Sequence, residues 1–267
     1  MLFRHAGAVD IPAEIASNLA GWSRVLVWES EPEALTWRMT SPAGKVRYLK
    51  TRPVTAAVPL PAEAARMRWA GAAGLPVPAV VATCRSGRAD WLLTDGLPGQ
   101  DATASDLRAE PERLVPLLAS ALRGFHQTPV GDCPFRFGPD EAMDDAARRV
   151  RAGLVRPEDM HPEHAHLSPV AALAEAARLR PAREPDLVLC HGDYCLPNVL
   201  IEAGRVTGFV DLGELAVADR WYDLATATWS VTWNLGPGWE ELFLASYGVS
   251  ADRQAIAFYR LIYDLAT

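Results

Sequence analysis

The stretch LCHGDYCLPNVL, residues 189–200, places polar groups directly after a short apolar run. Asp193 and Asn198 follow the apolar residues within one loop-sized segment, and the next apolar stretch, VTGFV (206–210), ends on Asp211. A hydrophobic core has no use for two carboxylates and a carboxamide at the ends of strand-like segments, because buried charges are costly unless they are paired. The pattern therefore indicates a site that handles charge.

The three side chains are of the types that phosphoryl transfer needs. Asn198 and Asp211 carry oxygen ligands of the hard kind that Mg²⁺ prefers, and Mg²⁺ completes its shell with phosphate and water. Asp193, on a loop after a strand, can face an open cleft, and a carboxylate base beside an Asn/Asp metal pair is the arrangement that phosphoryl transfer uses. For a single residue of this kind, a turn-capping role is the more common one. The spacing of all three favours the chemical interpretation.

Composition excludes several classes of protein. The 267 residues suffice for one large domain or two unequal lobes, and the 49% hydrophobic content is ordinary for a globular protein. A net charge of -7 argues against non-specific nucleic-acid binding, which needs a basic surface. No apolar run approaches the roughly 18 residues that span a bilayer, and the N-terminus lacks a signal-peptide pattern. We expect a cytoplasmic protein with no membrane or nucleic-acid partner. Its four cysteines lack C-x-x-C spacing, so they are expected to be free thiols.

The first third of the chain is rich in strand-like segments. They lie at residues 24–28, 34–40, 45–50 and 89–95, with a helix expected from about residue 62 to 73. The segment GLPGQD (96–101) follows and has the Gly/Pro content of a boundary between lobes. Beyond it, apolar residues mostly fall at helical spacing, and LVLC, NVLI and VTGFVD form a small β element.

The motif HGDYCLPN followed by GFVDLG resembles the catalytic and metal-binding motifs of the aminoglycoside phosphotransferases, relatives of the protein kinases. Further segments resemble the 3′-phosphotransferase branch in the same order: YLKT (48–51), DWLL…PGQD (90–101), CPF (133–135), GLV (153–155), VADRWYDLA (217–225) and IAFYRL (256–261). The resemblance implies an α+β, protein-kinase-like bilobal fold. Its β-rich nucleotide-binding lobe would span residues 1–96, with a hinge at 94–99, and its mostly helical catalytic and acceptor-binding lobe would span 97–267.

The resemblance also implies roles for individual residues. Asp193 would be the catalytic carboxylate, and Asn198 and Asp211 would hold Mg²⁺ against the phosphates of ATP or GTP. The implied nucleotide-contacting residues are Lys50, its ion-pair partner Glu63, Ser30, and the hinge residues Thr94, Asp95 and Leu97. The implied supports of the catalytic loop are His191, Asp219 and Asp223.

One departure from the family pattern lies between the first two strands. The family has a short loop of small or hydroxylated residues there, whose backbone N–H groups approach the triphosphate. Here the loop reads ESEPE (29–33), with no glycine and with Pro32 removing one N–H donor. Ser30 is the one hydroxyl, and the three glutamates are costly beside a triphosphate unless they point to solvent.

A second departure lies where the family builds its acceptor site. The 3′-phosphotransferases bind polycationic aminoglycosides with clustered carboxylates, and the loss of such charge-assisted hydrogen bonds costs roughly 1.5–3 kcal/mol each. Residues that stand here in place of acids are His161, Pro162, Trp229, Ser230 and Tyr263. The acceptor-binding residues that we expect are Glu163, Trp229, Trp233, Tyr263 and Asp264, with the two indoles one helical turn apart.

These features together predict a nucleoside-triphosphate-dependent kinase that phosphorylates a hydroxyl of a small-molecule antibiotic and confers resistance, as a monomer or homodimer. The missing acids favour a weakly charged acceptor, such as a nucleoside antibiotic of the capuramycin type, over an ordinary aminoglycoside. A pseudokinase that only binds ligands and a metabolic kinase for choline or a sugar are the alternatives. The intact catalytic residues argue against the first, and the ordered resemblance to the antibiotic branch argues against the second.

Overall fold

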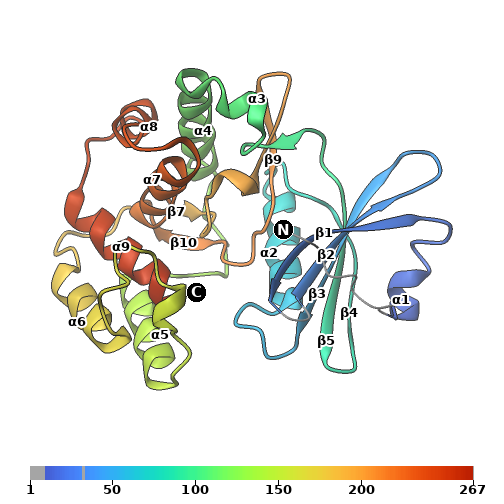
Figure 1. The fold of residues 1–267 in the computed structure, drawn as a ribbon, viewed down its shortest axis with the longest axis horizontal. Coiled ribbons are helices and arrows are strands. Elements are labelled where there is room, and N and C mark those ends of the chain that lie inside the picture. The colour runs from blue at the N-terminus through green and yellow to red at the C-terminus, as the bar shows by residue number, and fades with distance from the viewer. Residues whose placement is uncertain (1–9, 32–33, 267) are drawn as a thin grey trace. The chain divides into compact units, whose positions relative to one another are not determined.

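The computed structural model describes residues 10–31 and 34–266, except for the side chains of Ser30 and Glu31. The chain divides into two compact units, which Figure 1 shows as a β-rich part and a mostly helical part. The first unit comprises Met1–Gly99 together with Thr207–Glu214, and the second comprises Gln100–Val206 and Leu215–Thr267. Within the described residues, no helix is long and apolar enough to cross a membrane.

The first unit is built on a five-stranded antiparallel sheet of order β1-β2-β3-β5-β4. Its elements are α1 (Ala13–Ala16), β1 (Ser23–Glu31), β2 (Ala34–Thr40), β3 (Val46–Pro53), α2 (Leu60–Ala72), β4 (Val80–Ser86) and β5 (Ala89–Asp95). Alternate residues of β2, namely Leu35, Trp37 and Met39, are buried, as expected for a strand with one face on a core. Trp37 stacks on Trp91 of β5 with ring centroids 6.4 Å apart. This aromatic pair lies in the core on one face of the sheet.

The second unit is mostly helical. Its helices are α3 (Ser105–Arg108), α4 (Pro111–His126), α5 (Pro139–Arg151), α6 (Pro169–Leu179), α7 (Trp221–Leu235), α8 (Glu240–Tyr247) and α9 (Arg253–Ala266), with short 3₁₀ turns η1 (Pro157–Asp159) and η2 (Leu196–Asn198). Its strands are β6 (Gln100–Asp101), β7 (Leu187–Cys190), β8 (Val199–Glu202), β10 (Ala216–Asp219) and the start of β9 (Arg205–Phe209). Helix α7 is buried from Trp221 to Val231, which makes it the central helix of this unit.

The prediction of an α+β, kinase-like fold is confirmed, and all the expected strands are present. Ser168 caps α6 as its sequence indicates, with its side chain accepting a hydrogen bond from the Ala171 N–H. Strands β4 and β10 and helix α5 were not singled out from the sequence. The loop expected at 29–33 is shorter than predicted, because β1 continues to Glu31 and pairs there with Ala34; Pro32 and Glu33 lie outside the described residues.

The segment Thr207–Glu214 belongs to the first unit, although the sequence-based boundary assigns all residues from 97 to 267 to the second lobe. Specific hydrogen bonds explain the difference. The Phe209 N–H donates to the Pro76 carbonyl at 2.9 Å, and the Thr207 hydroxyl donates to the Pro98 carbonyl at 2.6 Å. The segment therefore carries Asp211 into the unit that holds the five-stranded sheet.

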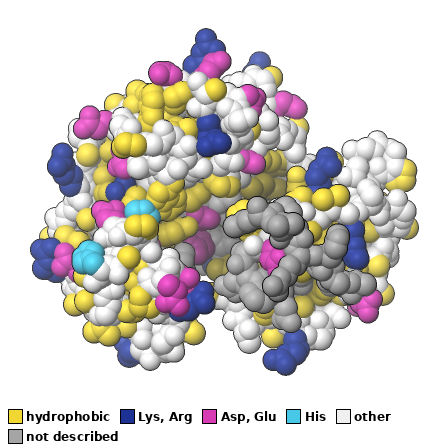
Figure 2. Space-filling view, viewed as in Figure 1, with side chains coloured by type: hydrophobic (Ala, Val, Ile, Leu, Met, Phe, Trp, Pro, Cys, Tyr) yellow, Lys and Arg dark blue, Asp and Glu magenta, His cyan; other side chains and the backbone are white. Residues whose placement is uncertain are grey.

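Charged side chains of both signs are interspersed among the described residues on the face drawn in Figure 2. On the face drawn in Figure 2, the described Lys and Arg side chains alternate with Asp and Glu side chains instead of collecting in one basic patch. This distribution agrees with the modest negative net charge of the sequence.

Close packing at Gly208 generates a test of the fold. A Cβ added there would lie 2.4 Å from Leu97 Cδ1 and 2.5 Å from the Pro76 carbonyl oxygen. We expect Gly208→Ala to lower the free energy of unfolding by about 1–3 kcal/mol, because overpacking forces the backbone to shift. Gly124→Ala, in α4 with open space around the new methyl group, is the control and should raise stability by roughly 0.5–1 kcal/mol. Urea unfolding of both variants measures this, and equal stabilities would contradict the packing described here.

Candidate active site

The loop that follows β7 is anchored by a buried carboxylate on α7. Asp223 accepts hydrogen bonds from the backbone N–H of His191 at 2.7 Å and from that of Gly192 at 2.8 Å. The Gly192 backbone has a φ of 92°, a conformation that glycine adopts without strain. His126 of α4 lies 3.0 Å from the same carboxylate through Nε2, and its Nδ1 lies 2.7 Å from the Tyr247 hydroxyl. The loop is therefore fixed by its backbone, which leaves its side chains free for other contacts.

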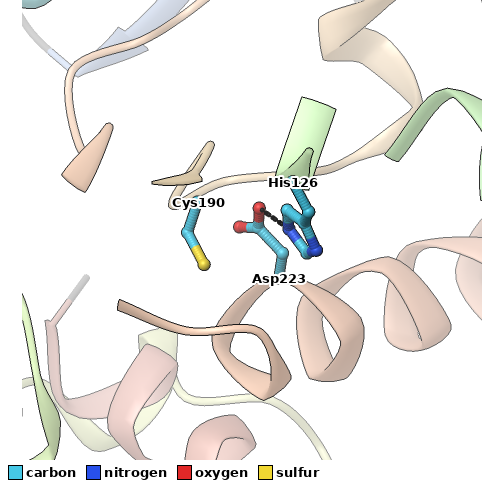
Figure 3. Close-up of side chains that lie close together, drawn as sticks. All are labelled: His126, Cys190 and Asp223. Atoms are coloured by element: carbon cyan, nitrogen blue, oxygen red, sulfur yellow. Dashed lines mark hydrogen bonds and ion pairs between the residues drawn. The ribbon is translucent and has the colours of Figure 1, made fainter. Parts of the chain in front are cut away.

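His126, Cys190 and Asp223 converge in the core, as Figure 3 shows, and their ligand atoms lie within 4.8 Å of one another. A metal would need the thiolate form of Cys190. Burial, together with the nearby Asp223 charge, raises the pKa of the Cys190 thiol well above its usual range. Both Asp223 oxygens already accept hydrogen bonds. The cluster is thus an anchor for the loop and lacks the chemistry of a metal site.

Asp193 presents its carboxylate on this loop with three side-chain donors around it. Tyr263 and Cys195 donate to Oδ1 at 3.2 Å and 3.1 Å, and the Asn198 amide donates to Oδ2 at 2.9 Å. The Asn198 amide also donates to the Asp193 carbonyl at 2.9 Å. With both bonds made through its nitrogen, the amide keeps its oxygen for a ligand.

His191 and Asp219, the other two residues expected to support the loop, lie in different parts of the second unit. His191 is fully buried, and its Nδ1 accepts from the Asp193 N–H at 3.2 Å, so it braces the loop from within. Asp219 is the last residue of strand β10 and precedes α7. Its carboxylate pairs with Arg183 at 2.9 Å and accepts from the Trp221 N–H at 3.2 Å. It therefore fixes the start of α7, the helix that carries Asp223.

The first unit carries a second set of charged side chains. Lys50 on β3 lies 2.8 Å from the Glu63 carboxylate on α2 and also pairs with Asp211. Glu63 is 1% exposed, and its Oε2 has no hydrogen-bond partner among the described residues. Asp211 has a φ of 61°, which a non-glycine residue seldom adopts and which is typical of functional sites. The ammonium of Lys50 is thereby held between two carboxylates from different parts of the chain.

The hinge residues are occupied by structural contacts within the first unit. Asp95 pairs with Lys45 at 3.0 Å and Arg47 at 2.9 Å; burial alone would raise its pKa, and these cations lower it. Thr94 is buried, and Leu97 packs on the backbone at Gly208. The side chains of Thr94 and Asp95 are thus engaged in contacts of the first unit. The side chain of Ser30, also expected at the nucleotide, lies outside the described residues.

Trp229, one of the residues expected at the acceptor, is buried in the structure. It is 2% exposed, its Nε1 donates to Glu163 Oε2 at 3.0 Å, and the Arg260 guanidinium lies 5.2 Å from its ring. Arg260 also lies 3.8 Å from Glu163 and 3.0 Å from Glu240. Glu163 is thus already matched by an N–H group and a cation of its own unit.

Asp264 is likewise satisfied internally. It is 4% exposed, pairs with His164 at 2.6 Å and accepts from the His161 N–H at 3.2 Å. The His161 ring lies 4.3 Å from Trp229 and 5.3 Å from Trp233, and its Nε2 accepts from the Trp233 indole at 2.7 Å. Burial lowers the pKa of the His161 imidazole, which favours its neutral form. Of the two predicted indoles, Trp233 alone stays exposed, at 45%.

Three contributors to this region were missed from the sequence: His126, Cys195 and Arg260. Arg260 lies in the segment IAFYRL and Cys195 in the motif HGDYCLPN, but neither residue was given a role from the sequence. His126 is the last residue of the amphipathic helix α4. A histidine at this position is usually explained by its favourable interaction with the helix dipole. Their roles depend on contacts between distant segments, which local patterns do not reveal.

Comparison with known proteins agrees with this geometry. A family model described as "Phosphotransferase enzyme family" matches residues 29–259. An aminoglycoside 3′-phosphotransferase of Streptomyces fradiae is 39% identical over 218 residues, covering 79% of this chain and 81% of its own. The crystal structure of an aminoglycoside-3′-phosphotransferase of type VIII superposes with a TM-score of 0.85 at 32% identity, covering 94% of this chain and 97% of its own. An aminoglycoside phosphotransferase of Streptomyces rimosus, in complex with ADP and streptomycin, gives 0.76 at 29% identity, covering 95% and 96%.

The fold and the anchored loop thus define a protein-kinase-like enzyme that transfers a phosphoryl group to an alcohol. The chain belongs to the phosphotransferase enzyme family, within which its relatives are aminoglycoside phosphotransferases. The family and the enzyme class predicted from the sequence are confirmed, and a nucleotide is the phosphoryl donor.

The anchor on α7 generates a prediction. Asp223→Ala leaves two backbone N–H groups and His126 without their buried acceptor, which should lower the free energy of unfolding by about 3–5 kcal/mol. Asp186→Ala is the matched control, because its carboxylate is 53% exposed in an ion pair with Arg220. That change should cost at most about 1 kcal/mol. Chemical unfolding compares the two variants, and a similar small loss for both would mean that Asp223 does not anchor the loop.

Proposed function

We propose that this protein transfers the γ-phosphoryl group of a nucleoside triphosphate to a hydroxyl of an aminoglycoside antibiotic and thereby inactivates it. The observation that carries the proposal is the catalytic loop, whose buried backbone anchor holds the Asp193 carboxylate beside the Asn198 amide. The names of the relatives supply the acceptor class, since they are aminoglycoside phosphotransferases. Because its donor is a cytoplasmic metabolite, we place the reaction in the cytoplasm.

In this proposal the residues divide the work of phosphoryl transfer, which depends mainly on positioning and on charge stabilisation. Asp193 accepts a hydrogen bond from the acceptor hydroxyl and orients it for attack. Lys50, kept in place by Glu63, contacts the nucleotide phosphates. The backbone of residues 94–97 receives the purine, whether adenine or guanine.

The donor groups fit a magnesium ion. Asp211 contributes carboxylate oxygens, and the Asn198 amide, with its nitrogen spent on Asp193, contributes its carbonyl oxygen. Such hard oxygen donors suit Mg²⁺, which also binds phosphate oxygens and would neutralise charge on the triphosphate. We therefore assign Asn198 and Asp211 as the residues that would hold it.

A weakly charged acceptor, such as a nucleoside antibiotic of the capuramycin type, is the second candidate. The observation that favours it is the internal pairing of Glu163 and Asp264, because paired acids attract a polycation less. Arg260 adds a positive charge to the same region. This candidate now ranks second, reversing the order from the sequence, because the relatives are aminoglycoside enzymes and Trp229 is buried.

A panel assay tests the proposal. Purified protein with ATP or GTP should phosphorylate one or more of kanamycin, neomycin and streptomycin. The assay measures the release of nucleoside diphosphate and the mass of the product. Asp193→Asn should lower that rate about 10²–10⁴-fold while leaving nucleotide binding intact, because the variant loses the hydroxyl-orienting carboxylate. Phosphorylation of nucleoside antibiotics alone would favour the second candidate. Nucleotide binding without transfer to any acceptor would favour a pseudokinase.

The metal assignment has its own test. Asp211→Ala and Asn198→Ala each remove one oxygen ligand, so the Mg²⁺ concentration for half-maximal rate should rise at least about 10-fold. Asp140→Ala is the control, because this acid is 78% exposed and lies on α5. Magnesium titrations of turnover measure the effect. If both curves coincide with the wild-type curve, the metal is held by other residues.

A further inference from the structure

The two oxygens of the Asp193 carboxylate are occupied unequally. Oδ1 receives the Tyr263 hydroxyl at 3.2 Å and the Cys195 thiol at 3.1 Å, whereas Oδ2 receives the Asn198 amide alone, at 2.9 Å. An ionised carboxylate offers about four lone-pair positions, two on each oxygen. Three are taken by side chains of the same unit. Within the part of the chain that the structure describes, one position is left, and it lies on Oδ2.

From this occupancy we infer that Tyr263 and Cys195 are positioning residues that restrict the acceptor hydroxyl to Oδ2 of Asp193 and so determine which hydroxyl is phosphorylated. The inference rests on the proposed function, since it concerns the hydroxyl that Asp193 orients. An antibiotic with several neighbouring hydroxyls can be phosphorylated at more than one of them only if more than one can reach the carboxylate. Blocking Oδ1 removes one of the two ways to reach it.

Tyr263 is held firmly enough for this task. It lies on α9, half-buried, with its ring edge-on to Trp229 at 6.3 Å and an interplanar angle of 84°. Trp229 is itself buried on the central helix α7, and it donates to Glu163. A phenol packed in this way has few rotamers, so its hydroxyl stays aimed at Asp193.

Cys195 donates to the same oxygen, at 3.1 Å. Burial and the Asp193 charge raise the pKa of its thiol well above the usual range, so the group keeps its proton. It is therefore a donor whenever Asp193 is ionised. A thiol is a weak donor, which makes Tyr263 the stronger of the two constraints.

The chemistry at position 263 explains what the tyrosine changes. An acid there, as expected from the resemblance to the 3′-phosphotransferases, is an acceptor only and would repel the Asp193 carboxylate. Such an acid could hold an amine of the acceptor but could not cover Oδ1. A phenol has the opposite effect, because it donates to the carboxylate and carries no charge at neutral pH.

The test is the position of phosphorylation on an aminoglycoside that the wild type accepts. Tyr263→Phe combined with Cys195→Ala uncovers Oδ1 without removing a residue of the nucleotide site. We expect the wild type to give one phosphorylated product and the double variant to give at least two, identified by NMR of the purified products. The kcat should fall roughly 10- to 100-fold, because the hydroxyl is less well oriented, with the KM for ATP unchanged.

Two control variants separate positioning from a structural effect. Tyr259→Phe removes a phenol from the same helix, and the Tyr259 hydroxyl is buried with no hydrogen-bond partner within the described residues. It should keep the single product. Cys195→Ser retains a donor, and when combined with wild-type Tyr263 it should also keep the single product.

The outcomes are distinguishable. A single, unchanged product from the double variant, with normal kcat, would overturn the inference while leaving the kinase in place. The same multiple products from Tyr259→Phe would also overturn it, because loosening of α9 would then be the cause. Failure of the wild type to phosphorylate any acceptor contradicts the proposed function itself.

Discussion

The rest of the second unit is arranged around one buried carboxylate, Asp223. It accepts two backbone N–H groups of the loop that carries Asp193 and lies beside His126, which in turn contacts Tyr247. An unpaired buried charge is costly, so Asp223 is stable only where these donors converge on it. The same requirement fixes the loop, because the donors are its own backbone. The carboxylate thus ties α7 to α4 and to the loop that carries Asp193.

Much of this arrangement could be predicted from local sequence. The alternation of buried and more exposed residues in β2, the helix cap at Ser168 and the motif from His191 to Asn198 can each be recognised from a few neighbouring residues. The Lys50–Glu63 ion pair was expected from resemblance alone, and the structure has these two side chains 2.8 Å apart. What local patterns could not supply is the pairing of residues far apart in the chain.

The acceptor region illustrates that limit. Glu163 and Trp229 are 66 positions apart in the sequence, and the hydrogen bond between them changes how the role of each side chain is interpreted. Read from the sequence, the acid is a free charge and the indole a stacking surface. In the structure each satisfies the other, and Arg260 covers the pair. Spacing on one helix indicated that Trp229 and Trp233 are neighbours, but it could not tell which of them is buried.

The path of the chain between the two units has a consequence for dissecting the protein. The chain passes from one unit to the other at residues 99/100, 206/207 and 214/215, so neither unit is a continuous stretch. A fragment cut at the hinge would lack Thr207–Glu214, and with it the ion-pair partner that Lys50 finds in Asp211. Separate expression of the two units by simple truncation would therefore yield incomplete modules. To study the first unit alone, the segment Thr207–Glu214 would have to be joined to the N-terminal fragment, for example by circular permutation of the gene.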